Sequence, residues 1–327
     1  RCQRLGRGFD SLDPLQKFIN RIKLNKSNLI TIVLQKYLKN RDIKNLRGSF
    51  FYYLLFRFCR IFLNNHIEIK IGNFKIFASY NKNKTSYFLL KKCDFGDNHE
   101  LNTLEKFSKL DKLCLLDCGA NYGFYSFHTA SLSSNNKIIA FEASTKTSKE
   151  FKINLDLNNF KNIKLENLAV SNSENKFLTF HESKKDWESS LSDNNFLNST
   201  PQKVKTTKID YILKDQNLEQ YYLFIKLDIE GNEFDAIRGS LVTIKKYSPI
   251  IIIEFSKYNL GNNKDDLSFL NYFLEKFDYS IYTTHNKKIE PKNIIDLLKK
   301  LNKRYQTIGN YYLIKNNSKE ENIFLHE

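Results

Sequence analysis

Short runs of apolar residues alternate with stretches of helical periodicity from Leu113 onward, and this pattern limits the fold more than any other feature of the sequence. Uninterrupted apolar runs are typical of strands buried on both faces, and their alternation with helices predicts βαβ units around a parallel sheet. Ligands of such sheets bind at the carboxyl ends of the strands, so the residues there are the candidates for a site. We expect helices at Lys146–Leu157, Glu233–Lys246 and Ile294–Leu301. We expect strands at Leu113–Leu116, Lys137–Phe141, Ile163–Leu165, Leu223–Leu227, Ile250–Ile253, Tyr279–Thr283 and Asn310–Ile314.

The N-terminal part of the chain follows a different pattern. Residues 14–63 have helical periodicity, and Ser49–Leu63 shows an apolar stripe with basic residues on the other side. This stretch fits either an interfacial membrane helix or a helix docked on the core, and we favour the docked helix. A Gly72-Asn73 turn between two alternating segments predicts a β-hairpin. We therefore divide the chain into a helical and hairpin region (1–95), an α/β domain (96–317) and a tail (318–327).

The composition limits the partners and the compartment. The chain carries 52 Lys and Arg against 36 Asp and Glu, a formal net charge of +16, which suits nucleic acid or an anionic membrane. The basic residues are spread along the chain, however, and Lys, Asn and Ile are abundant together, which favours a compositional bias. The five cysteines form no CxxC pair, so we expect neither a disulfide framework nor a zinc site, and a reducing, cytoplasmic compartment. No apolar run reaches the ~18 residues of an ordinary transmembrane helix.

The first strand of the α/β pattern ends in a glycine-rich turn, Asp117-Cys118-Gly119-Ala120-Asn121-Tyr122-Gly123. Glycines let a backbone approach a ligand closely, and the start of the following helix offers unpaired N–H groups. The dinucleotide spacing GxGxxG is not met, because Asn121 and Phe124 stand where its second and third glycines would be. We therefore expect neither a pyrophosphate cradle nor a P-loop at this turn.

The second strand of the pattern ends in Glu142, 19 residues after Gly123. A carboxylate at this place can grip the two hydroxyls of a ribose by accepting one hydrogen bond on each oxygen. Acids at two consecutive strand ends, with the glycine turn between them, indicate a nucleoside bound without a phosphate. We predict S-adenosylmethionine as the cofactor. The alternative makes Asp117 a helix cap and Glu142 a solvated loop acid.

Two motifs resemble those of FkbM-type methyltransferases. Asp117–Ser126 is similar to the family's DxGANxGxYS motif, and Lys226–Glu233, continued by Arg238-Gly239, is similar to its K-x-D-x-E-G-x-E…x-G block. The resemblance covers roughly residues 95–260 and includes Pro249–Glu254 and Ala169-Val170-Ser171. One departure is Ala143, where the family usually has Pro after the ribose acid, and it concerns the stiffness of the turn more than its chemistry.

The resemblance implies a class I methyltransferase fold over residues 96–317, with a Rossmann-like, mostly parallel seven-stranded sheet whose last strand is antiparallel. The N-terminal helical and hairpin region is an extension of this fold. The resemblance also implies methyl transfer from S-adenosylmethionine to a hydroxyl oxygen, often of a sugar. We expect the cofactor to bind at Asp117, Gly119, Ala120, Asn121, Gly123, Glu142 and Ala169.

Methyl transfer to an oxygen needs a group that removes a poorly acidic proton. The fourth strand supplies Lys226, Asp228 and Glu230 at every second position, which predicts one common face toward its carboxyl end. A buried lysine keeps a neighbouring acid ionised, so Asp228 is the candidate base, with Glu230 and Glu254 as alternates. The structural alternative is a Lys–Asp ion pair with Glu230 capping the next helix. The same acids could hold a divalent ion that acidifies the hydroxyl, which we leave open and do not predict.

A nucleic-acid methyltransferase is the rival function. No two prolines are adjacent, so the Pro-Pro-aromatic loop of base amino methylation is missing, and no proline precedes a cysteine, as cytosine C5 chemistry usually requires. An RNA ribose 2′-O activity and a non-catalytic scaffold remain open alternatives.

We predict an O-methyltransferase that acts on a saccharide, a cell-surface glycan or glycolipid precursor. The polar segment Ser171–Lys205 is long enough that it could fold over the acceptor. We expect a small-molecule or glycan acceptor, no nucleic acid, and a cytoplasmic location. Peripheral contact with the inner membrane surface is left open.

Overall fold

The computed structural model describes residues 66–79, 98–182, 200–229, 231–256, 264–300 and 307–326. The chain divides into two compact units, one of Arg1–Ile71 and Lys75–Cys93, the other of Gly72–Phe74 and Asp94–Glu327. Strands β1 (His66–Ile71) and β2 (Phe74–Ser79) form the predicted hairpin, and Gly72 in its turn has a φ of +54°. The helices predicted within residues 14–63, including Ser49–Leu63, lie outside the described residues.

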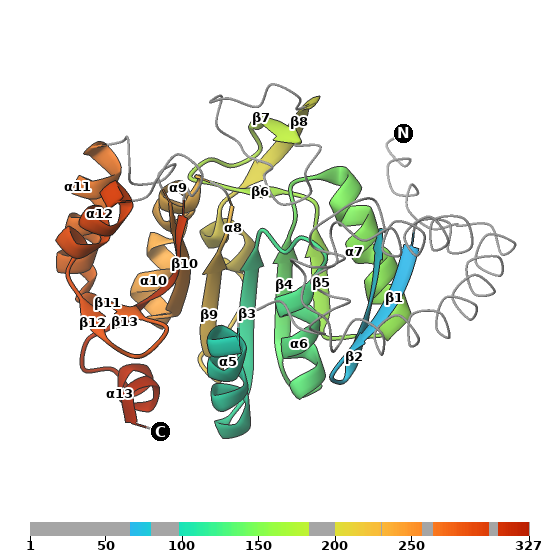
Figure 1. Ribbon diagram of the computed structural model, residues 1–327, viewed down its shortest axis with the longest axis horizontal. Helices are drawn as coiled ribbons and strands as arrows, with labels where there is room; N and C mark the ends of the chain where they lie inside the picture. The colour runs from blue at the N-terminus through green and yellow to red at the C-terminus, as the bar shows by residue number, and fades with distance from the viewer. Residues whose placement is uncertain are drawn as a thin grey trace, which may run out of the picture. The chain divides into compact units, whose positions relative to one another are not determined.

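Asp94–Glu327 contains an eight-stranded sheet with the strand order β12-β11-β13-β10-β9-β3-β4-β5 (Figure 1). The five strands β5, β4, β3, β9 and β10 pair in parallel, whereas β13 is antiparallel to both of its neighbours. This order and the antiparallel last strand are those of a class I methyltransferase sheet, and the short β12 adds an eighth strand at the edge. The strands are β3 (Leu113–Cys118), β4 (Lys137–Phe141), β5 (Ile163–Glu166), β9 (Tyr222–Leu227), β10 (Ile250–Ser256), β11 (Tyr279–Thr283), β12 (Lys288–Ile289) and β13 (Thr307–Lys315).

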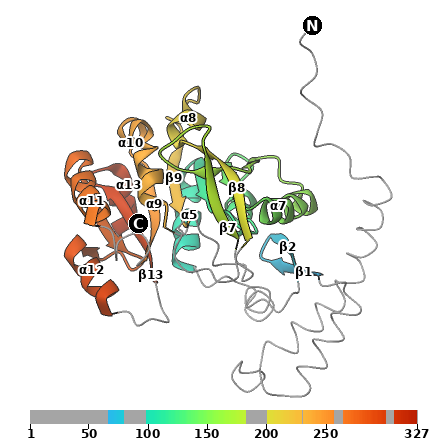
Figure 2. The same ribbon diagram turned by 90° about the horizontal axis from the view of Figure 1, so that it is seen from above.

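Helices lie on both faces of this sheet (Figure 2). On one face, the ring of Phe107 in α5 contacts Tyr222 and Phe224 of β9, each with ring centroids 5.1 Å apart. Helix α6 packs on the same face against β3 and β4. The helices of the unit are α5 (Asn98–Leu110), α6 (Phe124–Leu132), α7 (Thr145–Asn158), α8 (Ile209–Leu213), α9 (Glu233–Arg238), α10 (Leu241–Tyr247), α11 (Lys264–Phe277), α12 (Pro291–Lys300) and α13 (Lys319–His326).

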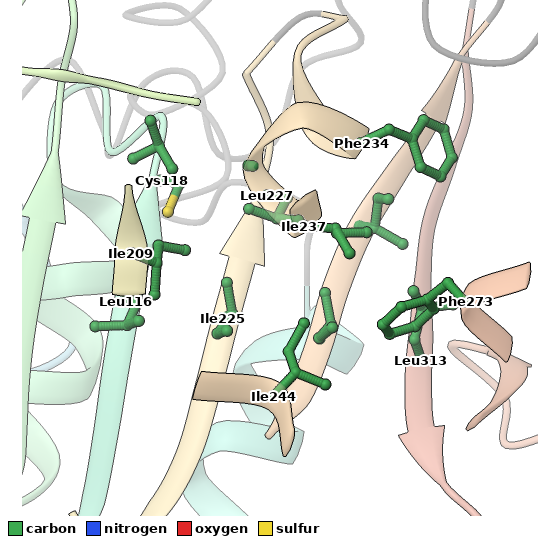
Figure 3. Close-up of a cluster of buried hydrophobic side chains, with 14 of the residues drawn as sticks. Leu116, Cys118, Ile209, Ile225, Leu227, Phe234, Ile237, Ile244, Phe273 and Leu313 are labelled. Carbon is green, nitrogen blue, oxygen red and sulfur yellow. The ribbon is translucent and has the colours of Figure 1, made fainter. Parts of the chain in front are cut away.

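The opposite face of the sheet carries a large buried apolar cluster (Figure 3). Every residue of β3 and β9 is buried, as the uninterrupted apolar runs predict. Burying one such side chain contributes about 1.5–3 kcal/mol to the stability of the fold. The cluster therefore holds the strands in place, and with them the residues at their carboxyl ends. The side chains labelled in Figure 3 come from three strands (Leu116, Cys118, Ile225, Leu227, Leu313) and four helices (Ile209, Phe234, Ile237, Ile244, Phe273).

Three segments differ from the expectations. The single helix expected at Glu233–Lys246 is two helices, α9 and α10, because the chain turns at Gly239, where a Cβ would lie 2.2 Å from the carbonyl oxygen of Ser171. The polar segment Ser171–Lys205 contributes the hairpin of β7 (Phe177–Glu182) and β8 (Thr200–Thr207), which pairs with β6 (Ala169–Val170); residues 183–199 lie outside the described part.

The expected tail holds α13, whose Phe324 ring lies 4.7 Å from that of Tyr312 in β13. Helix α13 is therefore attached to the sheet rather than extending from it.

Candidate active site

The glycine turn that joins β3 to α6 has an unusual backbone. Gly119, Asn121 and Gly123 all have positive φ, at +78°, +50° and +89°. The N–H groups of Gly119 and Ala120 both donate to the carbonyl oxygen of Phe141, at 3.0 and 2.9 Å, which ties the turn to the end of β4. A Cβ on Gly119 would lie 1.9 Å from the carbonyl oxygen of Asp228, so glycine is required where the ends of β3 and β9 meet.

Glu142, the acid expected to hold a ribose, lies at the end of β4 and is 7% exposed. One carboxylate oxygen accepts the N–H of Asn121 and the other accepts the N–H of Ser144, each at 2.8 Å. Burial raises the pKa of the Glu142 carboxyl to about 7, although the two backbone hydrogen bonds act in the opposite direction. Glu142 therefore supports the glycine turn directly. Each oxygen keeps a second lone pair that could accept a hydroxyl.

Asp117 at the end of β3 is almost fully buried, at 1% exposure. Its Oδ2 accepts the hydroxyl of Ser126 at 2.6 Å, while its Oδ1 has no hydrogen-bond partner. Burial raises the pKa of the Asp117 carboxyl, with Lys226 acting in the opposite direction. Ser126 was not among the residues expected at the site, although its place in the first turn of the helix after the glycines was a usable signal.

Two buried acceptor atoms without partners therefore belong to this one turn, Oδ1 of Asp117 and Oδ1 of Asn121. Unpaired buried polar atoms cost about 1–3 kcal/mol each, which a ligand with N–H or O–H donors would recover. The ammonium and hydroxyl groups of S-adenosylmethionine are such donors, so the residues present fit this cofactor. Ala169, the remaining expected cofactor residue, is buried in a small apolar cluster with Val204, Ala143 and Leu178.

Lys226 lies between the expected cofactor acid and the expected base. Its Nζ is 3.0 Å from Oδ2 of Asp228 and 3.9 Å from Oδ1 of Asp117, and it stands 4.8 Å from the ring centroid of Tyr125. The lysine side chain is 5% exposed, whereas that of Asp228 is 41% exposed. The buried ammonium of Lys226 therefore contacts two carboxyl groups that differ in exposure. Asp228 is therefore held by a cation on one side and open to solvent on the other.

The spacing of Lys226, Asp228 and Glu230 was expected to continue along one strand, but β9 ends at Leu227. Asp228, one residue past the strand, still donates its backbone N–H to the carbonyl oxygen of Cys118 at 3.2 Å, so its side chain lies on the same face as Lys226. Glu230 lies outside the described residues. The turn after β9 is held by Glu233, which is 1% exposed and whose carboxylate accepts the N–H groups of Ile229 and Gly231 at 3.1–3.2 Å. Glu233 thus holds the loop that presents Asp228, a role that was not expected from the sequence.

Glu254, the other alternate base, lies near the end of β10 and is half-buried. It stands opposite Asn310 of β13 in the antiparallel register. Strand alternation puts Glu254 on the same sheet face as Lys226, because Lys226 pairs with Ile252, two residues earlier on β10. In the part of the chain that the structure describes, no group of three or more His, Cys, Asp or Glu side chains could hold a metal ion.

The family model described as the Methyltransferase FkbM domain matches residues 117–281, just over half of the chain. This range runs from the acid of the glycine turn to β11 and includes Glu142, Lys226, Asp228 and Glu254. The comparison with curated proteins gave no match.

Several solved structures are similar at low identity. Methyltransferase FkbM from Methylobacillus flagellatus is 21% identical over 69% of this chain, with a TM-score of 0.38, and the match spans 52% of that longer chain. Precorrin-6y C5,15-methyltransferase from Geobacter metallireducens is 16% identical over 68% of this chain and 89% of its own, with a TM-score of 0.34. TYW2 of P. horikoshii, in complex with MeSAdo, is 12% identical over 77% of this chain and 72% of its own, with a TM-score of 0.39.

The family model carries the assignment, because it matches more than half of the chain, whereas the solved structures are similar only at low identity and low TM-score. The chain belongs to the FkbM methyltransferase family.

Proposed function

We propose that this protein transfers a methyl group from S-adenosylmethionine to a hydroxyl oxygen of a saccharide, either a cell-surface glycan or a glycolipid precursor. Membership of the FkbM methyltransferase family supports methyl transfer. The observation that carries the oxygen chemistry is the pairing of Lys226 with Asp228, since it orients a partly exposed carboxylate beside the glycine turn. The saccharide is the part of the proposal that rests on the resemblance to FkbM-type enzymes.

The cofactor would be held by residues of the glycine turn and by Glu142. Glu142 is placed to accept ribose hydroxyls, and the unpaired oxygens of Asp117 and Asn121 are placed to accept further donors. When bound, S-adenosylmethionine supplies a methyl group on a positively charged sulfur. The carboxylates of Asp117, Glu142 and Asp228 favour a cation at this edge of the sheet.

Asp228 is the group that would take the proton of the acceptor hydroxyl. Lys226 donates a hydrogen bond to the Asp228 carboxylate at 3.0 Å, which fixes the direction of this side chain. A hydroxyl bound against this carboxylate would be oriented for in-line attack, and aligning the two reactants is itself a large part of the catalysis. Glu254 and Glu230 stay the alternates, and an ion pair that only stabilises the loop is the structural alternative.

The compartment is also part of the proposal. Cys114 and Cys118, the cysteines in the described residues, are free and buried within β3, which supports the expected reducing, cytoplasmic location. None of the described helices has the length and apolar character needed to span a membrane. Ser49–Leu63, the segment that we considered for peripheral contact with the inner membrane surface, lies outside the described residues.

Labelled methyl transfer tests the proposal directly. We would incubate the protein with methyl-labelled S-adenosylmethionine and with a panel of saccharides, a lipid-linked glycan extract and total RNA, and identify products by mass spectrometry. Methylation of a saccharide hydroxyl is expected, whether or not a chelator is present. Label confined to RNA would favour the ribose 2′-O alternative, loss of activity with the chelator would favour the metal alternative, and no label with any acceptor would favour a scaffold.

A further inference from the structure

The cofactor residues occupy one side of the carboxyl edge of the sheet, which limits where an acceptor can approach. The glycine turn and Glu142 follow β3 and β4, and Asp228 follows the next strand, β9. The neighbours beyond β9 are β10 and then β13. A substrate that reaches Asp228 from the side away from the cofactor therefore lies over the ends of β10 and β13.

A buried polar group stands at this place. Asn310 of β13 lies opposite Glu254 of β10, and its Nδ2 donates to Oε1 of Glu100 at 2.9 Å. Glu100 lies in the first turn of α5 and is only 5% exposed, an unusual degree of burial for a carboxylate. Among the described residues, the side chain that donates a hydrogen bond to the Glu100 carboxylate is that of Asn310. A buried acid that only fixed the start of a helix would not need to lie against the sheet edge next to a candidate base.

The spacing suits a ring-sized ligand. Neighbouring strands lie about 4.8 Å apart, so β9 and β13, which flank β10, are about 10 Å apart. Glu254 and Asn310 are both half-buried, so their polar atoms border the edge instead of being sealed in the core. The bond from Nδ2 to Glu100 sets the direction of the Asn310 amide and leaves its oxygen on the side away from Glu100.

We propose that Glu254 and Asn310, with Asn310 held in place by Glu100, form the acceptor subsite and bind hydroxyl groups next to the one presented to Asp228. This inference rests on the proposed function and names residues for the acceptor. A carboxylate only accepts hydrogen bonds and an amide both donates and accepts, so the pair matches adjacent hydroxyls of a polyhydroxylated ring. An apolar acceptor would cover these polar groups without forming hydrogen bonds to them, so the subsite favours a polyhydroxylated one. Glu254 and Asn310 are specificity residues, and Glu100 is a positioning residue.

The competing explanation is that the Glu100–Asn310 bond only fastens α5 to β13. A second bond makes the same connection away from the edge: the hydroxyl of Tyr312 donates to Oγ1 of Thr103 at 3.0 Å. Thr103→Val removes that bond with little change of shape and is the matched control. Glu100→Gln keeps an oxygen that can accept the Asn310 N–H, whereas Glu100→Ala does not.

The test measures saccharide binding to the full chain saturated with S-adenosylhomocysteine. Saturation-transfer NMR would be recorded with the methyl glycosides of glucose, galactose, mannose and rhamnose. We expect at least one glycoside to bind, with affinity reduced tenfold or more by Asn310→Ala, Glu254→Gln and Glu100→Ala. Thr103→Val and Glu100→Gln should stay within threefold of the unmodified protein, and every variant should keep its affinity for S-adenosylhomocysteine.

Three results would overturn the subsite: no glycoside bound by the unmodified protein, unchanged binding by Asn310→Ala, or an equal loss with Thr103→Val. Failure of the unmodified protein to bind S-adenosylhomocysteine would instead refute the proposed function.

Discussion

Glu142 offers a pH-dependent test of the cofactor site. Burial raises the pKa of its carboxyl to about 7, and both of its oxygens already accept backbone N–H groups. Ribose hydroxyls donate to the ionised carboxylate, so cofactor binding should favour ionisation and release a proton below pH 7. With a pKa of about 7, roughly one tenth of the sites are ionised at pH 6 and nearly all at pH 8. S-adenosylhomocysteine should therefore bind about tenfold more tightly at pH 8 than at pH 6.

The stability of the protein without cofactor should change in the opposite direction. The pKa of the Glu142 carboxyl is about 4.5 in the unfolded chain and about 7 in the native protein. The raised pKa therefore contributes stability to the native state below pH 4.5, and this contribution is lost as the pH rises to about 7. A change of the Glu142 pKa from about 4.5 to about 7 corresponds to about 3 kcal/mol over that pH range. Thermal unfolding between pH 5 and 8 should show this loss of stability, while the affinity for S-adenosylhomocysteine rises.

Two substitutions separate the roles of Glu142. Glu142→Ala loses the paired hydrogen bonds to the ribose and should weaken S-adenosylhomocysteine binding by about 2–3 kcal/mol, roughly 30- to 150-fold. Glu142→Gln keeps the shape without the titration, so the pH dependence that Glu142 contributes should be lost. Glu166→Gln, at the end of the neighbouring strand β5, is the matched control and should change nothing.

Calorimetry across pH 6–8 in two buffers of different ionisation enthalpy measures both the affinity and the proton release. An affinity that is flat with pH in the unmodified protein, or undiminished pH dependence in Glu142→Gln, would refute the ribose assignment.

Three further predictions concern catalysis, the turn and the membrane. Asp228→Asn should lower turnover by about 10²–10⁴-fold with cofactor affinity little changed, whereas the exposed Asp215→Asn should have no effect; near-normal turnover in Asp228→Asn would move the role of base to Glu254. Gly119→Ala should be destabilised by at least about 2 kcal/mol more than Gly309→Ala in thermal unfolding, because both have positive φ but only Gly119 meets a backbone oxygen; equal losses would contradict the close approach. Anionic liposomes should not retain the protein if Ser49–Leu63 is a docked helix, and strong, salt-sensitive retention would show an interfacial one.

The sheet could be predicted from the sequence because each buried parallel strand appears there as an uninterrupted run of apolar residues. β4 and β11 begin and end at the predicted residues. The break between α9 and α10 could not be predicted in this way, since its cause is the contact of Gly239 with Ser171, 68 positions earlier in the chain. The strands β7 and β8 were missed because their alternation is interrupted by polar residues on both faces.

The residues of the candidate site also fall into two groups, those that the sequence predicts and those that it does not. Residues that follow one another in the glycine turn, and the acid at the end of the next strand, could be chosen from spacing alone. Glu100 and Asn310 lie at opposite ends of the domain sequence, 210 positions apart, and neither belongs to a motif. Only the antiparallel insertion of β13 beside β10 brings them to the edge where Glu254 stands. Sequence spacing therefore predicts the residues of the proposed cofactor side, whereas those of the proposed acceptor side follow only from the tertiary structure.

Lys226 connects these two sides. A lysine at 5% exposure is costly to bury, and removing one partner of a buried ion pair destabilises a protein more than the pair itself stabilises it. The Lys226 ammonium contacts a fully buried acid on the proposed cofactor side, Asp117, and a partly exposed acid on the proposed acceptor side, Asp228. A positively charged ligand near Asp117 would compete with Lys226 for that carboxylate and leave the ammonium more fully to Asp228. The contact between Lys226 and the proposed base would therefore depend on what occupies the proposed cofactor site, unlike that of a solvent-exposed ion pair.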